Sequence, residues 1–153
     1  MISRKTKYAL QALGRLAESP AGEPVLIADL AARERIPRKF LEAILVSLRK
    51  GGVLQSRVGR GGGYQLAVPA SEVTLARVVQ ILDGEFAPLP CLSAGHPTRC
   101  DDCDDLETCG TRLVMNDVRE AVAATLEGIT LADMVERSRA AAARRRGLVD
   151  FSI

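Results

Sequence analysis

The 153-residue sequence predicts a mainly α-helical protein with one small β-hairpin, arranged as a winged helix-turn-helix with one long helix later in the chain. Two helical patterns separated by a short turn are the first indication. Directly after them, a glycine-rich turn joins two short segments with strand character, which is the pattern of a hairpin. The third indication is an uninterrupted helical pattern late in the chain.

The first two helices are predicted at residues 3–18 and 25–36. Ser3 is a suitable N-cap for the first, whose apolar side chains recur at helical spacing. The second is short, and Leu26 and Leu30 are expected to face inward. A turn at "RERI" gives the spacing of a helix-turn-helix.

Residues 37–52 form the strongest predicted helix. Pro37 suits its first turn, and the Gly51–Gly52 pair ends it. Five side chains are predicted to form its apolar face: Phe40, Leu41, Ile44, Leu45 and Leu48.

The hairpin follows at once. Residues 53–58 and 64–67 have strand character, and the glycine-rich segment 59–63 is the turn between them. A hairpin placed directly after a helix-turn-helix is the wing of a winged helix.

The rest of the chain is again helical. Helices are predicted at 74–84 and 112–129, and a third at 130–146 that begins as a helix and frays into a basic tail. The 112–129 helix carries an apolar ridge at four-residue spacing: Val114, Val118, Val122 and Leu126. The small residues beside it (Ala121, Ala123 and Ala124) allow a second helix to approach closely. The ridge suits either a dimer interface or packing on the chain's own winged helix.

Composition and charge limit the function classes. No apolar run approaches the roughly 20 residues of a membrane span, and the basic N-terminus lacks the pattern of a signal peptide, so we expect a cytoplasmic protein. Residues 1–70 carry 12 Lys or Arg against 5 Asp or Glu, whereas residues 71–153 carry 9 against 14. The basic first half indicates a polyanionic partner, although solvated surface charge is the simpler alternative.

Basic side chains on the strongest helix and on the hairpin are the candidates for nucleic-acid contact. Arginine and lysine meet phosphates and guanine edges, and a glutamate accepts a hydrogen bond from the cytosine amino group. The 37–52 helix by itself is also consistent with an ordinary solvated amphipathic helix, but the adjacent basic hairpin favours DNA binding. The glycines do not fit the nucleotide-binding loops. The predicted DNA-binding residues are Arg38, Lys39, Glu42, Arg49, Arg57 and Arg60.

All four cysteines lie in one acidic segment, with the spacing Cys91-x8-Cys100-x2-Cys103-x5-Cys109. In a cytoplasmic protein such clusters are metal or redox sites rather than disulfides. Soft thiolates select iron–sulfur clusters, zinc or copper(I). Zinc is less favoured because only one Cys-x-x-Cys is present. A metal-free thiol switch is less favoured because neighbouring carboxylates disfavour the thiolate.

The single histidine, His96, falls in the same segment. A solvated loop histidine is the simpler interpretation, and a ligand role is the alternative. No histidine or lysine is placed to activate a thiol, so we expect no enzymatic activity.

The chain resembles the Rrf-two family of bacterial winged-helix regulators, the group of IscR, NsrR, RirA and CymR. Besides the cysteine segment, the resemblance rests on "KYALQALGRLA" (7–17), "IPRKFLEAILVSLRKGGVLQSRVGRGGGYQLA" (36–67) and "EGITLADMV" (127–135). It implies a homodimer joined by the long helix, with recognition helices in successive major grooves of a near-palindromic operator. It places Glu42 where members read a base and Arg60 in the wing. Members with a cluster ligate it through three cysteines of this segment.

By position, Cys91, Cys103 and Cys109 match the three family ligands. Two features depart from the pattern: Cys100 is additional, and Arg112 stands where IscR has a histidine ligand. Three ligand sets therefore remain open. Cys100 is a fourth ligand, or three cysteines leave an open site, or Cys100 ligates while Cys103 does not.

Together these observations predict three regions: a DNA-binding winged helix at 1–84, a cluster-binding loop at 85–111, and a dimerisation helix with a C-terminal helix or tail at 112–153. The predicted function is a homodimeric transcriptional regulator, most simply a repressor. Its iron–sulfur cluster, either 2Fe–2S or 4Fe–4S, senses iron, redox state or nitric oxide. The alternative is a winged-helix regulator with a thiol switch or a structural zinc ion.

Overall fold

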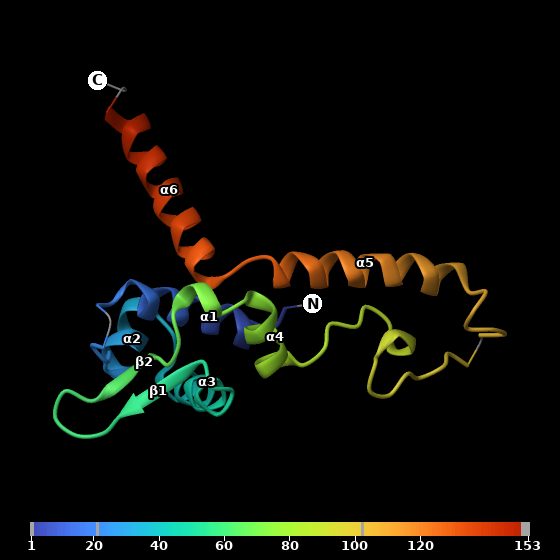
Figure 1. Cartoon of the computed structure of the whole chain (residues 1–153), viewed down its shortest axis with the longest axis horizontal. Helices are drawn as coiled ribbons and strands as arrows, with labels where there is room; N and C mark the ends of the chain where they lie inside the picture. The colour runs from blue at the N-terminus through green and yellow to red at the C-terminus, as the bar shows by residue number, and fades with distance from the viewer. Residues whose placement is uncertain (1, 21, 102, 151–153) are drawn as a thin grey trace.

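The structure is a computed structural model that describes residues 2–20, 22–101 and 103–150. A winged-helix body carries two projecting helices, one leading to the cysteine loop and one ending freely (Figure 1). The elements in chain order are α1 (Arg4–Glu18), α2 (Ile27–Glu34), α3 (Arg38–Lys50), β1 (Leu54–Arg57), β2 (Gly63–Leu66), the 3-10 turn η1 (Ala70–Glu72), α4 (Leu75–Asp83), the 3-10 turn η2 (Pro90–Leu92), α5 (Gly110–Glu127) and α6 (Leu131–Asp150).

The helix-turn-helix forms as the sequence predicts. The Ser3 hydroxyl caps α1 by accepting the backbone N–H of Thr6 at 3.2 Å. Helix α2 ends at Arg35, which takes the left-handed conformation with φ of 55°. The following N–H of Ile36 then donates to the carbonyl of Ala31 at 3.0 Å, which completes the turn into α3.

The core lies between α1, α3, α4 and the base of the hairpin. It is built from fully buried aliphatic side chains, the largest being Leu13, Leu30, Leu41, Ile44, Leu45, Leu48, Leu54 and Leu131. Two expected core residues lie outside it. Leu26 is 49% exposed because α2 begins only after it, and Phe40 is 39% exposed because it lies in the first turn of α3. The Phe40 ring instead meets the ring of Tyr8 edge to face at 5.8 Å.

The hairpin is antiparallel, with Leu54 opposite Leu66, and its far strand is pinned to the body. Val25 and Tyr64 exchange two backbone hydrogen bonds of 2.9 Å. A Cβ on Gly63 would lie 2.2 Å from the carbonyl oxygen of Val25, so only glycine allows this approach. The wing therefore has a fixed direction relative to α1 and α2.

Helix α5 leads away from the body toward the cysteine loop (Figure 1). None of its residues, all of which the structure describes, is buried. Its apolar ridge divides: Val122 and Leu126 face a pocket shared with Val79 of α4, whereas Val114 and Val118 are 60% and 41% exposed. The ridge thus packs on its own chain at one end and presents an uncovered apolar surface at the other.

Helix α6 corrects the expectation of a frayed tail, since the helix continues to Asp150. Its Ala and Arg residues are strong helix formers. The first turn is capped by Thr130 and Asp133, whose backbone N–H groups donate to each other's side chains at 2.8 and 3.2 Å. The Thr130 hydroxyl and backbone N–H lower the pKa of the Asp133 carboxyl.

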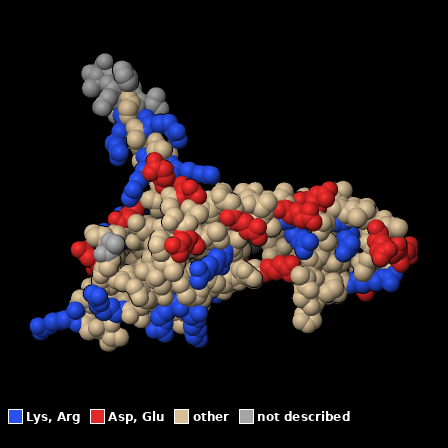
Figure 2. Space-filling view, viewed as in Figure 1, with Lys and Arg blue, Asp and Glu red and all other residues tan. Residues whose placement is uncertain are grey.

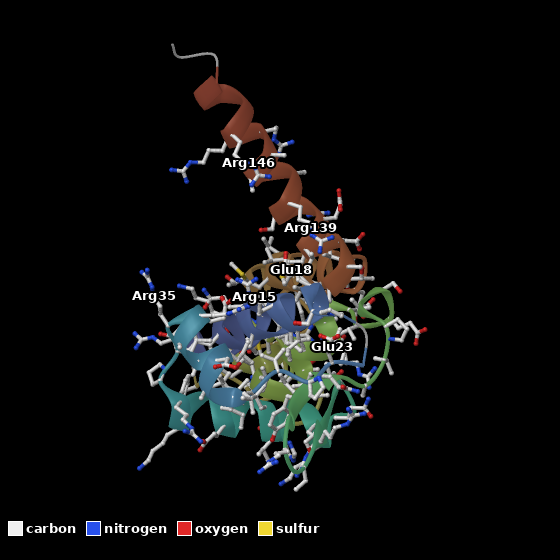
Figure 3. All side chains as sticks on the ribbon, turned by 90° about the vertical axis from the view of Figure 1, so that its left-hand side faces the viewer. Arg15, Glu18, Glu23, Arg35, Arg139 and Arg146 are labelled. Carbon is white, nitrogen blue, oxygen red and sulfur yellow. The ribbon has the colours of Figure 1, made fainter. Side chains whose placement is uncertain are left out.

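The base of α6 packs on α1. Leu131 and Val135 are buried there, and Arg139 lies 3.6 Å from Glu18 (Figure 3). Residues 141–147 are all exposed, and Arg146 stands near the free end of the helix (Figure 3). The two parts of α6 therefore differ: its first turns belong to the body, whereas residues 141–147 stand in solvent.

Candidate nucleic-acid interface and cysteine pocket

The exposed face of α3 carries four of the six predicted DNA-binding residues. Arg38 Nε donates to Glu42 Oε1 at 3.0 Å, and the two side chains are 65% and 43% exposed. An exposed ion pair of this kind adds little stability. Its consequence is geometric: both groups are held together on the open side of the helix that follows the turn. Lys39 and Arg49 are also exposed.

The hairpin supplies the other two. Arg57 ends β1 and Arg60 lies in the turn, and both are exposed. Arg49 Nη1 donates to the Ser56 hydroxyl at 3.2 Å, which joins α3 directly to β1. The structure therefore places the basic groups of helix and wing on adjoining surfaces.

Charge separates along the molecule. Lys and Arg atoms gather over the hairpin and the lower edge of the body, whereas Asp and Glu atoms dominate along α5 and the cysteine loop (Figure 2). The predicted basic half thus contributes the wing side, whereas the predicted acidic half divides into the acidic α5 and cysteine loop and an outer part of α6 that carries arginines (Figure 2). A polyanion is attracted to the wing side and repelled by the loop side.

All four cysteines line a single pocket of about 440 Å³ at the start of α5. They reach it from three elements: Cys91 from η2, Cys100 and Cys103 from the loop, and Cys109 as the N-cap of α5. Cys91 is buried, Cys103 and Cys109 are half-buried, and Cys100 is exposed, and none forms a disulfide. Cys100 therefore lies at the rim and the other three further in.

Hydrogen bonds within the loop hold this arrangement. The Arg99 guanidinium donates to the carbonyl oxygens of Cys103 and Asp104, the Nε contact to Cys103 being 2.7 Å. Asp105 accepts the backbone N–H of Glu107 and the hydroxyl of Thr108, which lowers the pKa of the Asp105 carboxyl. The turn between the inner cysteines is thus ordered by its own polar groups.

Arg119 ties the pocket to the long helix. Its Nη1 donates to the carbonyl of Leu92 at 3.4 Å and to the carboxylate of Glu85 at 3.5 Å. Leu92 follows Cys91 in η2, so this contact joins α5 to the residue next to that cysteine. Glu85 also accepts the backbone N–H of Ala94 at 2.8 Å.

Within the described residues, no three His, Cys, Asp or Glu side chains converge closely enough to hold one metal ion. His96 is exposed and is not among the residues that line the cysteine pocket. Sequence reasoning missed the roles of Arg99 and Arg119. No local motif marks them, because their partners are backbone carbonyls fixed only by the fold.

A family model matches residues 2–137, and its description is Rrf2, iron-dependent transcriptional regulator. The chain belongs to this Rrf2 family, the Rrf-two family that the sequence resembles. An rrf2-like HTH-type transcriptional regulator of Rhodobacter capsulatus is 40% identical over 145 residues, which cover 93% of this chain and 97% of that protein. IscR of Serratia proteamaculans is 31% identical, over 88% of this chain and 78% of its own length.

Solved Rrf2 structures have the same fold. The structure of T. potens IscR matches with a TM-score of 0.70 at 27% identity and covers 90% of this chain and 88% of its own. That of CymR, titled the global cysteine regulator of B. subtilis, has a TM-score of 0.74 at 24% identity, with 90% and 97% covered. The winged-helix prediction is confirmed by these neighbours.

Family membership makes the chain an Rrf2-type transcriptional regulator that binds DNA. Its relatives and structural neighbours are regulators, not enzymes. In the part of the chain that the structure describes, no helix is long and apolar enough to cross a bilayer.

Proposed function

We propose that this protein is a homodimeric, cytoplasmic repressor that reads a near-palindromic operator and senses iron, redox state or nitric oxide through an iron–sulfur cluster. Its functional division follows the three regions predicted from sequence: 1–84 binds DNA, 85–111 carries the sensor and 112–153 joins the subunits. The observation that carries the proposal is the single pocket at the start of α5 that all four cysteines line.

The DNA-reading surface is proposed to be α3 with the hairpin. Arg38 and Glu42 occupy the exposed face near the start of α3, the part of a recognition helix that meets base edges. Arg57 and Arg60 suit phosphate or minor-groove contacts from the wing. The Arg49–Ser56 bond keeps the wing in register with the helix.

Two substitutions separate base reading from phosphate binding. In titrations with operator and scrambled duplexes, Glu42→Ala loses discrimination at one base pair per half-site, by about 1–3 kcal/mol, and keeps nonspecific affinity. Arg60→Ala weakens all sequences alike and reduces the salt slope by about one. Equal loss on every sequence for Glu42→Ala contradicts its base-reading role.

The dimer is proposed to form through the uncovered part of α5. Val114 and Val118 are exposed apolar side chains on a helix with no buried residue, and such a ridge suits a second helix. Sedimentation should show a particle of twice the 16.4 kDa chain mass. Val118→Arg should give monomers, whereas Asp117→Arg, one position along the same helix, should leave the dimer intact. Dimers that survive Val118→Arg place the interface elsewhere.

The residues of the pocket fit an iron–sulfur cluster better than a single zinc ion. A structural zinc site usually has two Cys-x-x-Cys pairs, whereas this chain has one, Cys100-x2-Cys103. An iron–sulfur cluster distributes its thiolate ligands over two or four irons, so sulfurs spread around a pocket of about 440 Å³ suit it. When bound, a cluster supplies one-electron chemistry and sensitivity to oxidants, nitric oxide and iron shortage.

Cys91, Cys103 and Cys109 are the proposed ligands because they lie further in than Cys100. Serine substitutions test this after anaerobic purification. Each of the three inner substitutions should abolish bound iron, whereas Cys100→Ser should retain it. Loss of iron in all four variants makes Cys100 the fourth ligand, and retention only in Cys103→Ser reverses the roles of Cys100 and Cys103.

The chain's own contacts connect the pocket to the DNA-binding body. Arg119 joins α5 to η2 and to Glu85. Asp83 lies two residues before Glu85. Its carboxylate accepts the backbone N–H of Ser3, the residue that precedes α1, at 2.9 Å. A change in the pocket is therefore transmitted to both the proposed dimer helix and α1. A sensor shifts DNA affinity only by its differential affinity for the two arrangements, typically about 1–3 kcal/mol.

A further inference from the structure

The turn of the hairpin carries an apolar side chain that lies almost wholly in solvent. Val58 is 95% exposed, whereas the other exposed large apolar side chains of the described residues are 39% to 60% exposed. A single exposed apolar side chain is ordinary on a protein surface, so the meaning of Val58 depends on what surrounds it. It stands between Arg57 and Arg60, the two exposed arginines of the wing.

The tip of the wing is thin. Within residues 58–63 only Val58 and Arg60 have side chains, because the other four positions are glycine. The backbone N–H of Gly62 donates to the carbonyl of Gly59 at 2.9 Å, which closes the turn. The turn between β1 and β2 projects from the body (Figure 1). The wing therefore presents a narrow backbone edge with one apolar and one basic side chain.

The position of this tip beside α3 indicates which part of a duplex it meets. Arg49 of α3 is hydrogen-bonded to Ser56 of β1, and the Val25–Tyr64 bridge pins β2, so the wing is held next to the proposed recognition helix. A helix in the major groove has a phosphate backbone on each side, and beyond that backbone lies the minor groove. The minor groove is about 6 Å wide, so a bare glycine backbone enters it more readily than one with bulky side chains.

We propose that Val58 is a specificity-determining residue, which packs in the minor groove beside the major groove read by α3 and selects A·T over G·C pairs there. The inference deepens the proposed function and rests on the DNA-reading role given there to α3 and the hairpin. In the minor groove, a G·C pair differs from an A·T pair by the guanine N2 amino group, a hydrogen-bond donor. Beside the isopropyl group of Val58, that donor loses its water and gains no acceptor.

The test begins with the full-length protein and a pool of duplexes of random sequence. The protein is used both as purified anaerobically and after removal of any cluster, and the duplexes that it binds define the preferred site. A hydroxyl-radical footprint, which reports the exposure of sugars along the minor groove, then locates the base pairs that the wing covers. We expect protected minor-groove sugars beside each half-site.

Three versions of one covered base pair separate minor-groove from major-groove contacts. The pairs are A·T, G·C and inosine·C, and inosine is guanosine without the N2 amino group. The wild type should bind the A·T and inosine·C duplexes about equally, and the G·C duplex about fivefold or more weakly, because only that duplex places an amino group beside Val58.

Val58→Thr assigns this discrimination to the side chain. Threonine keeps the shape of valine, and its hydroxyl accepts a hydrogen bond from the amino group, so the G·C penalty should fall to about twofold or less. The salt slope should not change, because no charge is removed. Arg60→Ala, from the same turn, is the matched control: it should weaken binding of all three duplexes alike and keep the ratio between them. Circular dichroism confirms that both variants fold.

A G·C penalty that is equal in the wild type and in Val58→Thr overturns the proposal, and so does a wild type that binds all three duplexes alike. In both cases the selected site remains, and the proposed reading of an operator stands. If the random pool yields no preferred site, the proposed function itself fails, and the inference about Val58 fails with it. The two failures are thus distinguishable.

Discussion

Gly63→Ala is the substitution whose cost the structure defines best. The new Cβ would lie 2.2 Å from the carbonyl oxygen of Val25, on a backbone with φ of +153°. The Val25–Tyr64 bridge must open to relieve this contact, which breaks two hydrogen bonds of 2.9 Å. Each such bond contributes about 1 kcal/mol net, so their loss costs about 2 kcal/mol. The unfavourable φ adds about 1 kcal/mol, for a total of about 3 kcal/mol.

Thermal unfolding followed by circular dichroism measures this loss. A domain of this size loses roughly 2–4 °C of Tm per kcal/mol, so Gly63→Ala should unfold about 6–12 °C lower. Gly61→Ala is the control: its φ is +72°, but a Cβ there meets nothing within 4 Å. Gly61→Ala therefore carries only the cost of placing alanine in the left-handed backbone region, and should lower the free energy of unfolding by about 1 kcal/mol. The wing of Gly63→Ala should also lose its fixed direction, which weakens operator binding. A stability loss no larger than that of Gly61→Ala refutes the argument that the Val25 contact fixes the wing.

Three further predictions concern the carboxylate at the end of α4, the clamp on η2 and the free end of α6. Burial alone would raise the pKa of Asp83, but hydrogen bonds from the Ser3 hydroxyl and backbone N–H outweigh it and lower that pKa. The stabilisation of the folded protein is therefore present above the unfolded pKa near 3.8 and is lost as pH falls through the lower folded pKa. Asp83→Asn should therefore be less stable than the wild type by about 1 kcal/mol or less at pH 7, and equally stable near pH 2. Urea unfolding at both pH values measures the two differences, and an equal loss of stability at both contradicts the role given to the ionised carboxylate. Arg119→Met should free η2 from α5 and speed alkylation of Cys91 in cluster-free protein several-fold, while an unchanged rate means that the contact with Leu92 does not position this cysteine. Truncation after Ala140 removes residues 141–147, which are all exposed, together with the rest of the C-terminus, and should cost less than about 1 kcal/mol in urea unfolding, whereas a larger loss shows that this part of the chain packs in solution.

Local patterns in the sequence predict the winged helix well. The period of 3.6 in α3 and the glycine turn of the wing each specify their own structure, and the structure contains both. The exposed positions of Leu26 and Phe40 were not predictable in this way, because both residues fit the apolar period. Their exposure depends on where each helix begins and on what packs beside it, which is tertiary information.

The cysteine segment was identifiable from composition, but its geometry was not. Spacing shows that four thiols are close in sequence and leaves open which of them share a pocket. The pocket depends on Arg99 and Arg119 binding backbone carbonyls, contacts that involve no side-chain pattern. Likewise, only the fold shows that Arg112 lines the same pocket as the four cysteines.

The most direct test of the account is anaerobic purification, with a visible absorption spectrum and iron, sulfide and zinc analysis of one sample, followed by operator titration before and after cluster removal. We expect a brown protein with iron and sulfide near stoichiometric and a band shape that identifies the cluster as 2Fe–2S or 4Fe–4S. Its operator affinity should change about 5- to 150-fold when the cluster is removed. A colourless protein that carries zinc, or one that stays metal-free after attempted reconstitution, contradicts the sensor hypothesis and leaves a winged-helix regulator with a structural zinc ion or a thiol switch.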